Sequence, residues 1–187
     1  MRFTKLAIPD VIRIEIDKIE DDRGFFGRMF CQQELAEQGI EFKIAQCNNT
    51  LTEHAGTLRG LHFQRPRESD SRTAEAKIVR CFQGGVMDVA VDLRANSATF
   101  GRACSLELTA ANRSMVYIPP GFAHGFQTLM PKTELFYFHS DFYSKPDEGG
   151  LHPLDSSVGI DWPLPVAQLS TRDQALPELS QLRPIEL

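Results

Sequence analysis

The chain has 187 residues, a net charge of −5 and a hydrophobic content of 42%, values that suit one folded domain with a substantial core. The acidic balance argues against nucleic acid as the main partner, because that affinity rests on basic surface. No apolar run approaches the roughly 20 residues of a membrane span, and residues 1–10 lack the apolar core of a signal peptide, so neither a membrane nor export is expected.

Short β-strands separated by turns dominate the expected secondary structure. In chain order, strands are predicted at residues 12–19, 58–64, 76–82, 85–93, 103–108, 114–118, 125–129 and 133–139, with one short helix at 32–38. Many short strands without helices between them indicate an all-β antiparallel sandwich, barrel or jelly roll. Residues 1–187 are interpreted as one domain, in which residues 144–187 form a C-terminal arm. The four cysteines show no CxxC spacing and are interpreted as free thiols of a cytoplasmic protein.

The strand predicted at 85–93 alternates most regularly. Its odd-numbered positions from 87 to 93 are all apolar, whereas Asp88 and Asp92 lie on the opposite face. If that face lines a barrel interior, the aspartates are buried and need partners. On an outer face they would simply be solvated.

The stretch Arg59-Gly60-Leu61-His62-Phe63-Gln64 is the first candidate for chemistry. Histidine transfers protons near neutral pH and arginine binds carboxylates and phosphates, although a histidine in an apolar strand is more commonly a hydrogen-bonded core residue. Strict alternation would place Arg59 and His62 on opposite faces of the strand. Both reach one pocket only with a bulge at Gly60, and we expect an irregularity there.

Residues 65–75 form a polar segment that contains Arg65, Arg67 and Arg72. A solvated loop is the default for such mixed charge. Beside a pocket mouth, however, the arginines would steer an anionic substrate.

The segment Ile118-Pro119-Pro120-Gly121-Phe122-Ala123-His124-Gly125-Phe126 resembles the second histidine motif of cupins, which are small β-barrel proteins. Metal-binding cupins supply a His-x-His pair from an earlier strand. This chain has His62-Phe63-Gln64 there, a poor ligand set for a transition metal, so no metal or other cofactor is expected. His54, His139 and His152 show no ligand spacing and are predicted at the surface.

Proton-transfer groups are the remaining chemical tools. His62 would serve as a general base if a carboxylate orients its other ring nitrogen. Tyr137 would be a general acid or, as is commoner for tyrosine, a core aromatic. The sequence has no GxxxxGK[ST], GxGxxG or GxSxG motif, so nucleotide hydrolysis, Rossmann cofactors and serine hydrolysis lack their usual signatures.

Six motifs in order resemble the dTDP-4-dehydrorhamnose 3,5-epimerase family of sugar-nucleotide epimerases, across about residues 5–177. These motifs are Asp22-Arg23-Gly24-Phe25-Phe26, Gln46-Cys47-Asn48, Arg59-Gly60-Leu61-His62-Phe63-Gln64, Val86-Met87-Asp88-Val89-Ala90-Val91-Asp92-Leu93-Arg94, Pro120-Gly121-Phe122-Ala123-His124-Gly125-Phe126 and Leu169-Ser170-Thr171-Arg172-Asp173.

The resemblance implies a metal-free, cupin-type jelly roll (a double-stranded β-helix) with short helices, and a homodimer in which a partner strand helps close each site. The implied substrate is a dTDP-4-keto-6-deoxyhexose, whose 4-keto group acidifies the hydrogens on C3 and C5. His62 matches the base that removes such a hydrogen, Asp173 the carboxylate that orients this base, and Tyr137 the acid that returns a proton to the opposite face. Asp88 is expected to hold the ring of His124. The implied substrate-binding residues are Arg23, Gln46, Asn48, Arg59, Lys77, His124, Tyr143, Glu148 and Arg172.

Three positions depart from the family pattern. Arg28 stands where glutamate is common, Phe138 follows Tyr137 in place of lysine, and Arg172 replaces a lysine before Asp173. Recognition of the nucleotide and the sugar therefore stays open. The alternatives are inversion of C3 or C5 alone on a related sugar nucleotide, a cupin metal oxygenase, and a non-catalytic carbohydrate-binding cupin.

Overall fold

The computed structural model describes residues 1–66 and 74–187, and within these residues the chain is mostly β-strand. The strands are β1 (Arg2–Lys5), β2 (Ile12–Glu15), β3 (Lys18–Asp21), β4 (Gly24–Gly27), β5 (Gln46–Thr52), β6 (Leu58–Gln64), β7 (Lys77–Gln83), β8 (Gly85–Asp92), β9 (Ala103–Thr109), β10 (Met115–Ile118), β11 (Phe122–Thr128), β12 (Thr133–His139) and β13 (Glu148–Gly150). The helical segments are α1 (Gln32–Glu37), η1 (Lys145–Asp147), α2 (Thr171–Gln174) and η2 (Leu179–Gln181).

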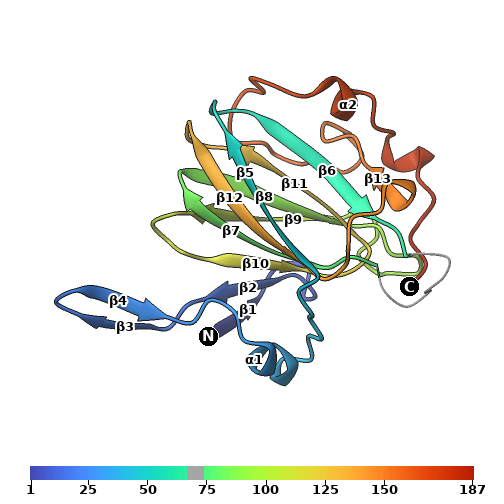
Figure 1. Cartoon of the computed structure of the whole chain (residues 1–187). Coiled ribbons are helices and arrows are strands. Elements are labelled where there is room, and N and C mark those ends of the chain that lie inside the picture. Colours follow the sequence, from blue (N-terminus) through green and yellow to red (C-terminus); the bar gives the residue numbers. More distant parts are fainter. Residues whose placement is uncertain (67–73) are drawn as a thin grey trace.

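The described residues form two antiparallel sheets that face each other, together with a separate hairpin of β3 and β4 (Figure 1). One sheet has the order β1-β2-β10-β7-β12-β5 and the other the order β13-β6-β11-β8-β9. This architecture confirms the predicted all-β jelly roll, and the space between the two sheets is where a site can form.

Strand β8 has the predicted two faces, and both are covered. The odd-numbered side chains pack outside the barrel in a cluster that includes Leu151 and Ile185 of the C-terminal segment. Asp88 and Asp92 share the face toward the other sheet and are only 2% and 0% exposed. Asp92 meets its need for a partner through Arg94, whose Nη2 lies 2.7 Å from Oδ2. The barrel-interior interpretation of this face is therefore the right one.

The single strand predicted at residues 12–19 is wrong, because two strands occupy this region. Strand β2 pairs with β1 and β10, whereas β3 pairs with β4. The alternation of apolar and polar residues breaks at Asp17-Lys18, where two polar residues follow each other. The pairing partner changes at this break, as the chain leaves the body.

Four further strands were not predicted, namely β1, β4, β5 and β13. Strand β5 matters most, since it borders the site, and its sequence is rich in asparagine, which is uncommon in strands. It lies at the edge of the six-stranded sheet and pairs with β12. An edge position tolerates polar residues, because only one face and one side are buried.

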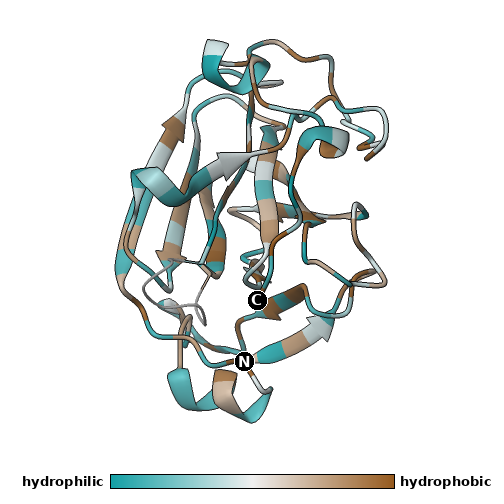
Figure 2. Ribbon diagram, turned by 90° about the vertical axis from the view of Figure 1, so that its right-hand side faces the viewer, coloured by the Kyte–Doolittle hydropathy of each residue, from teal (hydrophilic) through white to brown (hydrophobic). Residues whose placement is uncertain are grey.

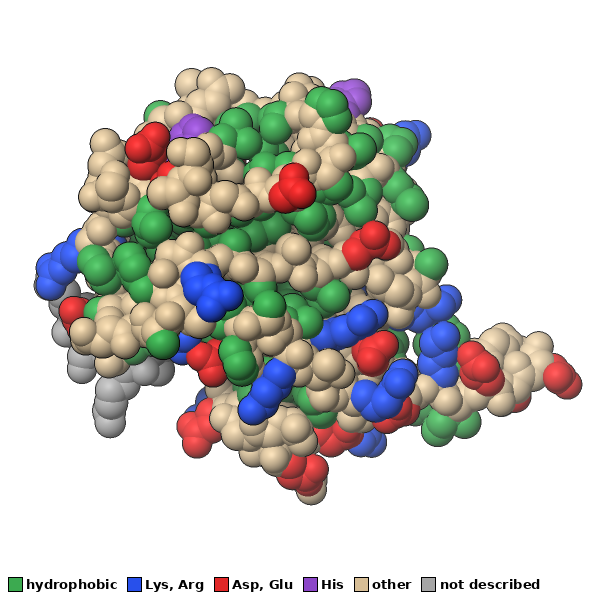
Figure 3. Space-filling model, turned by 180° about the vertical axis from the view of Figure 1, so that it is seen from behind, with side chains coloured by type: hydrophobic (Ala, Val, Ile, Leu, Met, Phe, Trp, Pro, Cys, Tyr) green, Lys and Arg blue, Asp and Glu red, His purple; other side chains and the backbone are tan. Residues whose placement is uncertain are grey.

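The predicted short helix at 32–38 is confirmed as α1. Leu35 is its buried residue and packs in a cluster with Phe42 and Phe138 on the outer side of the six-stranded sheet. The hairpin of β3 and β4 projects clear of the body (Figures 1 and 3). It exposes two large apolar side chains, Ile19 at 72% and Phe26 at 73%.

The C-terminal residues pack along the outer face of the five-stranded sheet (Figure 2). Strand β13 adds to the edge of β6, and the Ile185 amide donates to the Leu93 carbonyl at 2.7 Å. The segment between them carries α2 toward the open end of the barrel. Among the described residues, no helix has the length and apolar character needed to cross a membrane.

Candidate active site

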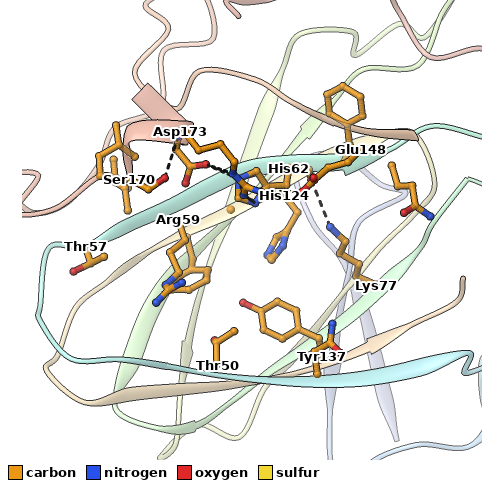
Figure 4. A pocket seen from close by; sticks show the side chains of 18 of the residues that line it. Thr50, Thr57, Arg59, His62, Lys77, His124, Tyr137, Glu148, Ser170 and Asp173 are labelled. Atoms are coloured by element: carbon orange, nitrogen blue, oxygen red, sulfur yellow. Dashed lines mark hydrogen bonds and ion pairs between the residues drawn. The ribbon is translucent and has the colours of Figure 1, made fainter. Parts of the chain in front are cut away.

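A cavity of about 1060 Å³ opens between the sheets, with β6 and β11 on one wall and β5, β7 and β12 on the other (Figure 4). Most of the residues predicted for a site meet in it. Those that line the cavity are Asn48, Arg59, His62, Lys77, His124, Tyr137, Tyr143, Glu148, Arg172 and Asp173.

His62 on β6 and Asp173 on α2 make a direct contact at the upper wall of the cavity (Figure 4). His62 Nε2 lies 2.8 Å from Asp173 Oδ1, and the Gly60 amide donates to Asp173 Oδ2 at 3.2 Å. Ser170 caps α2, because its hydroxyl accepts from the Asp173 amide at 3.0 Å. The cap fixes the backbone that carries the carboxylate, so Asp173 is held at both its backbone and its side chain.

The surroundings of His62 keep it neutral. Burial lowers the pKa of His62 below its usual value, Asp173 opposes this effect, and the positive charges of Arg172 and Lys77 add to it. Burial acts to raise the pKa of Asp173, but contacts with His62 and the Gly60 amide outweigh burial and lower it. An ionised carboxylate beside a neutral imidazole is the state in which the imidazole can accept a proton.

The guanidinium of Arg172 lies against the same ring. Its Nη2 is 2.6 Å from His62 Nε2 and 3.4 Å from Nδ1, and its Nη1 donates to Glu148 Oε1 at 3.0 Å. An ionised carboxylate only accepts, so opposite Asp173 the Nε2 of His62 is an N–H donor, and the 2.6 Å approach of Arg172 Nη2 to Nε2 is not a hydrogen bond. The lone pair of His62 is therefore on Nδ1, which lies 3.4 Å from the same Nη2.

The predicted irregularity at Gly60 is confirmed. Opposite β6, the pairing passes from His124–His62 directly to Phe126–Arg59, so β6 has one residue more than β11 over this step. Gly60 has a φ of +118°, and a Cβ atom there would lie 2.7 Å from the Cα of Gly125. The extra residue turns Arg59 and His62 to the same side, and both line the cavity.

His124 and Tyr137 form the inner end of the cavity. His124 Nε2 lies 2.9 Å from Asp88 Oδ2, so the expected contact between these two side chains is present. The rings of His124 and Tyr137 meet edge to face at 6.1 Å. Burial raises the pKa of Tyr137, and the charge of Asp88 adds to this effect, so the phenol keeps its proton. Tyr137 comes from the sheet opposite His62 and lies across the cavity from it (Figure 4).

The prediction of a surface position for His139 is wrong. His139 is 8% exposed and lines the cavity, since β-strand alternation places it on the same face as Tyr137. Its Nδ1 lies 2.6 Å from Glu75 Oε1, and Glu75 Oε2 lies 3.3 Å from Lys77 Nζ. Sequence reasoning also missed Glu75, although its spacing of two residues from Lys77 indicates a shared face. His54 is exposed as predicted, and His152 is partly buried.

The rim of the cavity carries Arg59 and Tyr143, and Gln46 contacts Tyr143 without lining the cavity itself. Arg59 Nε donates to Thr52 Oγ1 at 3.0 Å, and within the described part of the chain no carboxylate pairs with Arg59. Tyr143 is 58% exposed. Its hydroxyl donates to Glu148 Oε2 at 3.1 Å, and its amide donates to Gln46 Oε1 at 2.9 Å.

The structure does not bring Arg23 to the cavity. Arg23 lies at the tip of the projecting hairpin, where its 89% exposed side chain pairs with Asp21. Two of the departures from the family pattern also lie elsewhere. Arg28 donates to Glu34 of α1 at 2.7 Å, and Phe138 stacks on Phe30 at 5.7 Å on the outer side of the sheet.

Of the three arginines predicted to steer an anion, only Arg65 is among the described residues. Arg65 donates to the carbonyls of Arg183 and Pro184 and therefore faces the C-terminal segment. Arg67 and Arg72 fall in residues 67–73, outside the described part of the chain.

Gln64 occupies the position where metal-binding cupins have a second histidine. Its amide is bound to backbone on both sides, donating to the Phe142 carbonyl at 3.0 Å and accepting from the Ser144 amide at 2.7 Å. Among residues 1–66 and 74–187, no cluster of three or more His, Cys, Asp or Glu side chains has an arrangement that could hold a metal ion.

Comparison with known proteins finds similar chains over nearly the whole length. Residues 5–181 match the family model described as dTDP-4-dehydrorhamnose 3,5-epimerase. The enzyme of that name from Salmonella typhimurium is 41% identical over 183 residues, which cover 97% of each chain. The dTDP-4-dehydrorhamnose 3-epimerase of Streptomyces niveus is 36% identical and covers 98% of this chain and 86% of its own.

A solved structure is also similar over nearly its whole length. The dTDP-6-deoxy-D-glucose-3,5-epimerase of Legionella pneumophila, determined in complex with dTDP-4-keto-L-rhamnose, superimposes with a TM-score of 0.89 at 34% identity. The match covers 100% of this chain and 98% of the Legionella chain.

Proposed function

The chain belongs to the dTDP-4-dehydrorhamnose 3,5-epimerase family, and from this premise we propose that it inverts C3 and C5 of a dTDP-4-keto-6-deoxyhexose in deoxysugar biosynthesis. The observation that carries the proposal is the pair of proton-transfer groups on opposite walls of one cavity. The base candidate His62 and the acid candidate Tyr137 come from facing sheets.

The proposed reaction begins with proton abstraction beside the 4-keto group. Nδ1 of neutral His62 removes the hydrogen from C3 or C5, and the electron pair moves into the carbonyl to give an enolate. Asp173 stabilises the imidazolium that forms, through the 2.8 Å contact with Nε2. Tyr137 then donates its phenolic proton to the opposite face of the same carbon, which inverts that centre.

Positive charge and hydrogen-bond donors around the cavity support the enolate and the diphosphate. Lys77 and His124 lie on the inner walls and are assigned to the developing negative charge on the sugar oxygen. Arg59 is assigned to the diphosphate, since a guanidinium without a carboxylate partner is free to bind phosphate oxygens. Asp88 orients His124 through their 2.9 Å contact.

The rim is assigned to the nucleotide. Tyr143 presents an exposed ring for stacking on thymine, and Glu148 and Gln46 hold its hydroxyl and its amide. Asn48 and Arg172 complete the assigned binding residues. Arg172 contacts His62, Asp173 and Glu148. We therefore assign it to binding the part of the substrate that lies beside His62.

Inversion of C3 alone is the second candidate. The Streptomyces niveus relative is named as a 3-epimerase at 36% identity, a level close to that of relatives named as 3,5-epimerases. One base and one acid suffice for one centre or for two, so the residues assigned above fit both reactions.

We also propose a homodimer in which each hairpin of β3 and β4 reaches the partner's cavity. Three observations support it: Arg23 lies far from the cavity of its own chain, the hairpin projects from the body (Figure 3), and Ile19 and Phe26 are exposed on it. Large exposed apolar side chains on a projecting element are typical of association surfaces.

Mixing two inactive variants tests the dimer. A heterodimer of His62→Ala and Arg23→Ala chains has one cavity with an intact base and an Arg23 supplied by the partner. Random exchange of subunits should restore about a quarter of wild-type activity. No recovery from subunits shown to exchange would remove Arg23 from the partner's site.

We further propose that residues 1–187 act as one domain in the cytoplasm. The packing of Leu151 and Ile185 against β8 supports a single domain, because it joins the C-terminal segment to the barrel. A cytoplasmic location is supported by the four free thiols, those of Cys31, Cys47, Cys81 and Cys104.

Identification of the product tests the proposed reaction. The protein is incubated with dTDP-4-keto-6-deoxyglucose, and the proton couplings of the sugar ring are read by NMR. Couplings of a sugar inverted at C3 and C5 are expected, whereas inversion at C3 alone would favour the second candidate. An unchanged sugar with wild-type protein would contradict both.

A further inference from the structure

Glu75 and His139 form a buried polar pair in the cavity wall that the proposed reaction does not use. Their side chains are 9% and 10% exposed. His139 Nδ1 lies 2.6 Å from Glu75 Oε1, and the ring of His139 stacks on Tyr137 at 5.8 Å with an interplanar angle of 20°. The pair therefore contacts the proposed acid directly.

A chain of hydrogen bonds fixes which ring nitrogen of His139 accepts and which one donates. Gln46 Nε2 donates to Asn48 Oδ1 at 3.5 Å, which turns Asn48 Nδ2 toward His139 Nε2 at 3.2 Å. His139 Nε2 thus accepts, and Nδ1 carries the hydrogen that it donates to Glu75. A hydrogen bond from Nδ1 leaves the negative charge of Glu75 to be balanced by a cation.

Lys77 is that group. Its ammonium lies 3.3 Å from Glu75 Oε2 and donates to the backbone carbonyl of His62 at 3.5 Å. Burial acts to raise the pKa of Glu75, but Lys77 and His139 outweigh it and lower the pKa to about 2. Glu75 is therefore ionised at neutral pH and attracts the ammonium at all times.

An ammonium has three donors. Glu75 and the His62 carbonyl accept two of these hydrogen bonds, which leaves one donor of Lys77 for a ligand. The side chains of Glu75, Lys77 and His139 all line the cavity in which that ligand would bind. A pair that fixes the direction of a free donor in this cavity is well placed to act on the reaction.

We infer that Glu75 and His139 are positioning residues, which hold Lys77 so that its free donor points at the sugar oxygen where negative charge develops. This inference rests on the proposed function. Neither residue is assigned a contact with the substrate. Glu75 acts through Lys77, and His139 acts through Glu75 while its ring supports that of Tyr137.

A double-mutant cycle tests the inference. Glu75→Gln is made in the wild type and in Lys77→Met, and Glu107→Gln on the exposed face of β9 is the matched control. In the wild type, Glu75→Gln should lower kcat by about ten- to a hundredfold, which is the scale seen for residues that orient a ligand group. It should change KM by less than about threefold. In Lys77→Met, the same change should lower kcat by less than about threefold.

Equal losses of kcat in the two backgrounds would overturn the inference, as would a rise in KM at constant kcat. If Glu75→Gln does not fold, Glu75→Asp takes its place, because the shorter side chain keeps the charge but withdraws it from Lys77.

A readout without substrate separates this inference from the proposed reaction. The ¹⁵Nζ signal of Lys77 should show slow hydrogen exchange in the wild type and in Glu107→Gln, and fast exchange in Glu75→Gln. An unchanged Lys77 signal would contradict the positioning role whatever the enzyme catalyses. Failure of the wild type to epimerise a 4-keto sugar, with the Lys77 signal altered as expected, would contradict the proposed function alone.

Discussion

His62 and Asp173 stand 111 positions apart in the chain, and their imidazole and carboxylate lie 2.8 Å apart. Three local features produce this contact: the bulge at Gly60, the Ser170 cap of α2, and the C-terminal segment that carries α2 to the open end of the barrel. The contact makes one ring nitrogen a donor and leaves the other free to act as a base.

Replacement of the Asp173 carboxylate by an amide should keep a group beside the His62 ring but remove the negative charge. Asp173→Asn presents an amide to His62 Nε2 and no longer stabilises the imidazolium, so kcat should fall by at least about a hundredfold. Asp155→Asn is the control, since Asp155 binds backbone and Ser157 away from the cavity. Steady-state kinetics with a 4-keto sugar nucleotide measures both. A kcat within threefold of wild type for Asp173→Asn would remove it from the mechanism.

Loss of the phenol should stop inversion but not deprotonation. Tyr137→Phe keeps the ring but has no proton to deliver, so His62 returns deuterium to the face from which it took hydrogen. Substrate should then exchange hydrogen with D₂O and yield little epimer, while Tyr117→Phe, in the cluster beside α1, behaves as wild type. Normal product formation by Tyr137→Phe would assign the acid to another group.

The charge of Arg172 should be visible in the pH profile. Positive charge at Arg172 helps lower the pKa of His62, and the base is active only when neutral. Activity therefore falls as pH decreases through the pKa of His62, and Arg172→Met should move this acid limb of kcat/KM to higher pH. Arg102→Met, at an exposed position, serves as control. An acid limb that stays in place or moves to lower pH would contradict the charge argument.

Glu75 should contribute to acid denaturation. Its pKa is lowered from 4.5 to about 2 in the folded protein, so its ionised form stabilises the fold above pH 4.5, and this contribution is lost as pH falls from 4.5 toward 2. Denaturant unfolding across that window should show a steeper loss of stability for the wild type than for Glu75→Gln. Parallel curves would show that Glu75 has an ordinary pKa.

Gly60 should tolerate no side chain. A Cβ there meets the Cα of Gly125 at 2.7 Å, at a φ of +118°, so Gly60→Ala should lower the free energy of unfolding by about 3 kcal/mol or more. At Gly39, φ is also positive but no atom lies within 4 Å. Gly39→Ala should therefore cost only about 1 kcal/mol. Equal effects at the two positions would argue against the close approach of β6 and β11.

The strand pattern limited the fold to an antiparallel sandwich, barrel or jelly roll, and it gave β8 an apolar face and a face with Asp88 and Asp92, because alternation records which side chains share a face. The jelly roll itself came from the resemblance, and the structure showed that the aspartates face inward. The strand pattern also required an irregularity at Gly60. The partnership of His62 with Asp173 came only from the resemblance of ordered motifs, since no spacing rule links residues so far apart in the chain.

Other parts of the site were missed in the sequence. Strand β5 is polar because it forms a sheet edge, and it was therefore missed. His139 looked like an isolated surface histidine, although its parity with Tyr137 places it inward. Glu75 was assigned to a solvated loop, and only the fold shows that it meets Lys77 and His139. Arg23 was assigned to a site that its own chain does not bring near it.

Deuterium incorporation shows whether His62 removes the hydrogens from C3 and C5. The wild type and His62→Ala are each incubated with dTDP-4-keto-6-deoxyglucose in D₂O, and the label at C3 and C5 is read by NMR. Deuterium is expected at both carbons with the wild type and at neither with His62→Ala. Absence of label with the wild type, or label that persists in His62→Ala, would contradict the assignment of His62 as the base of an epimerase.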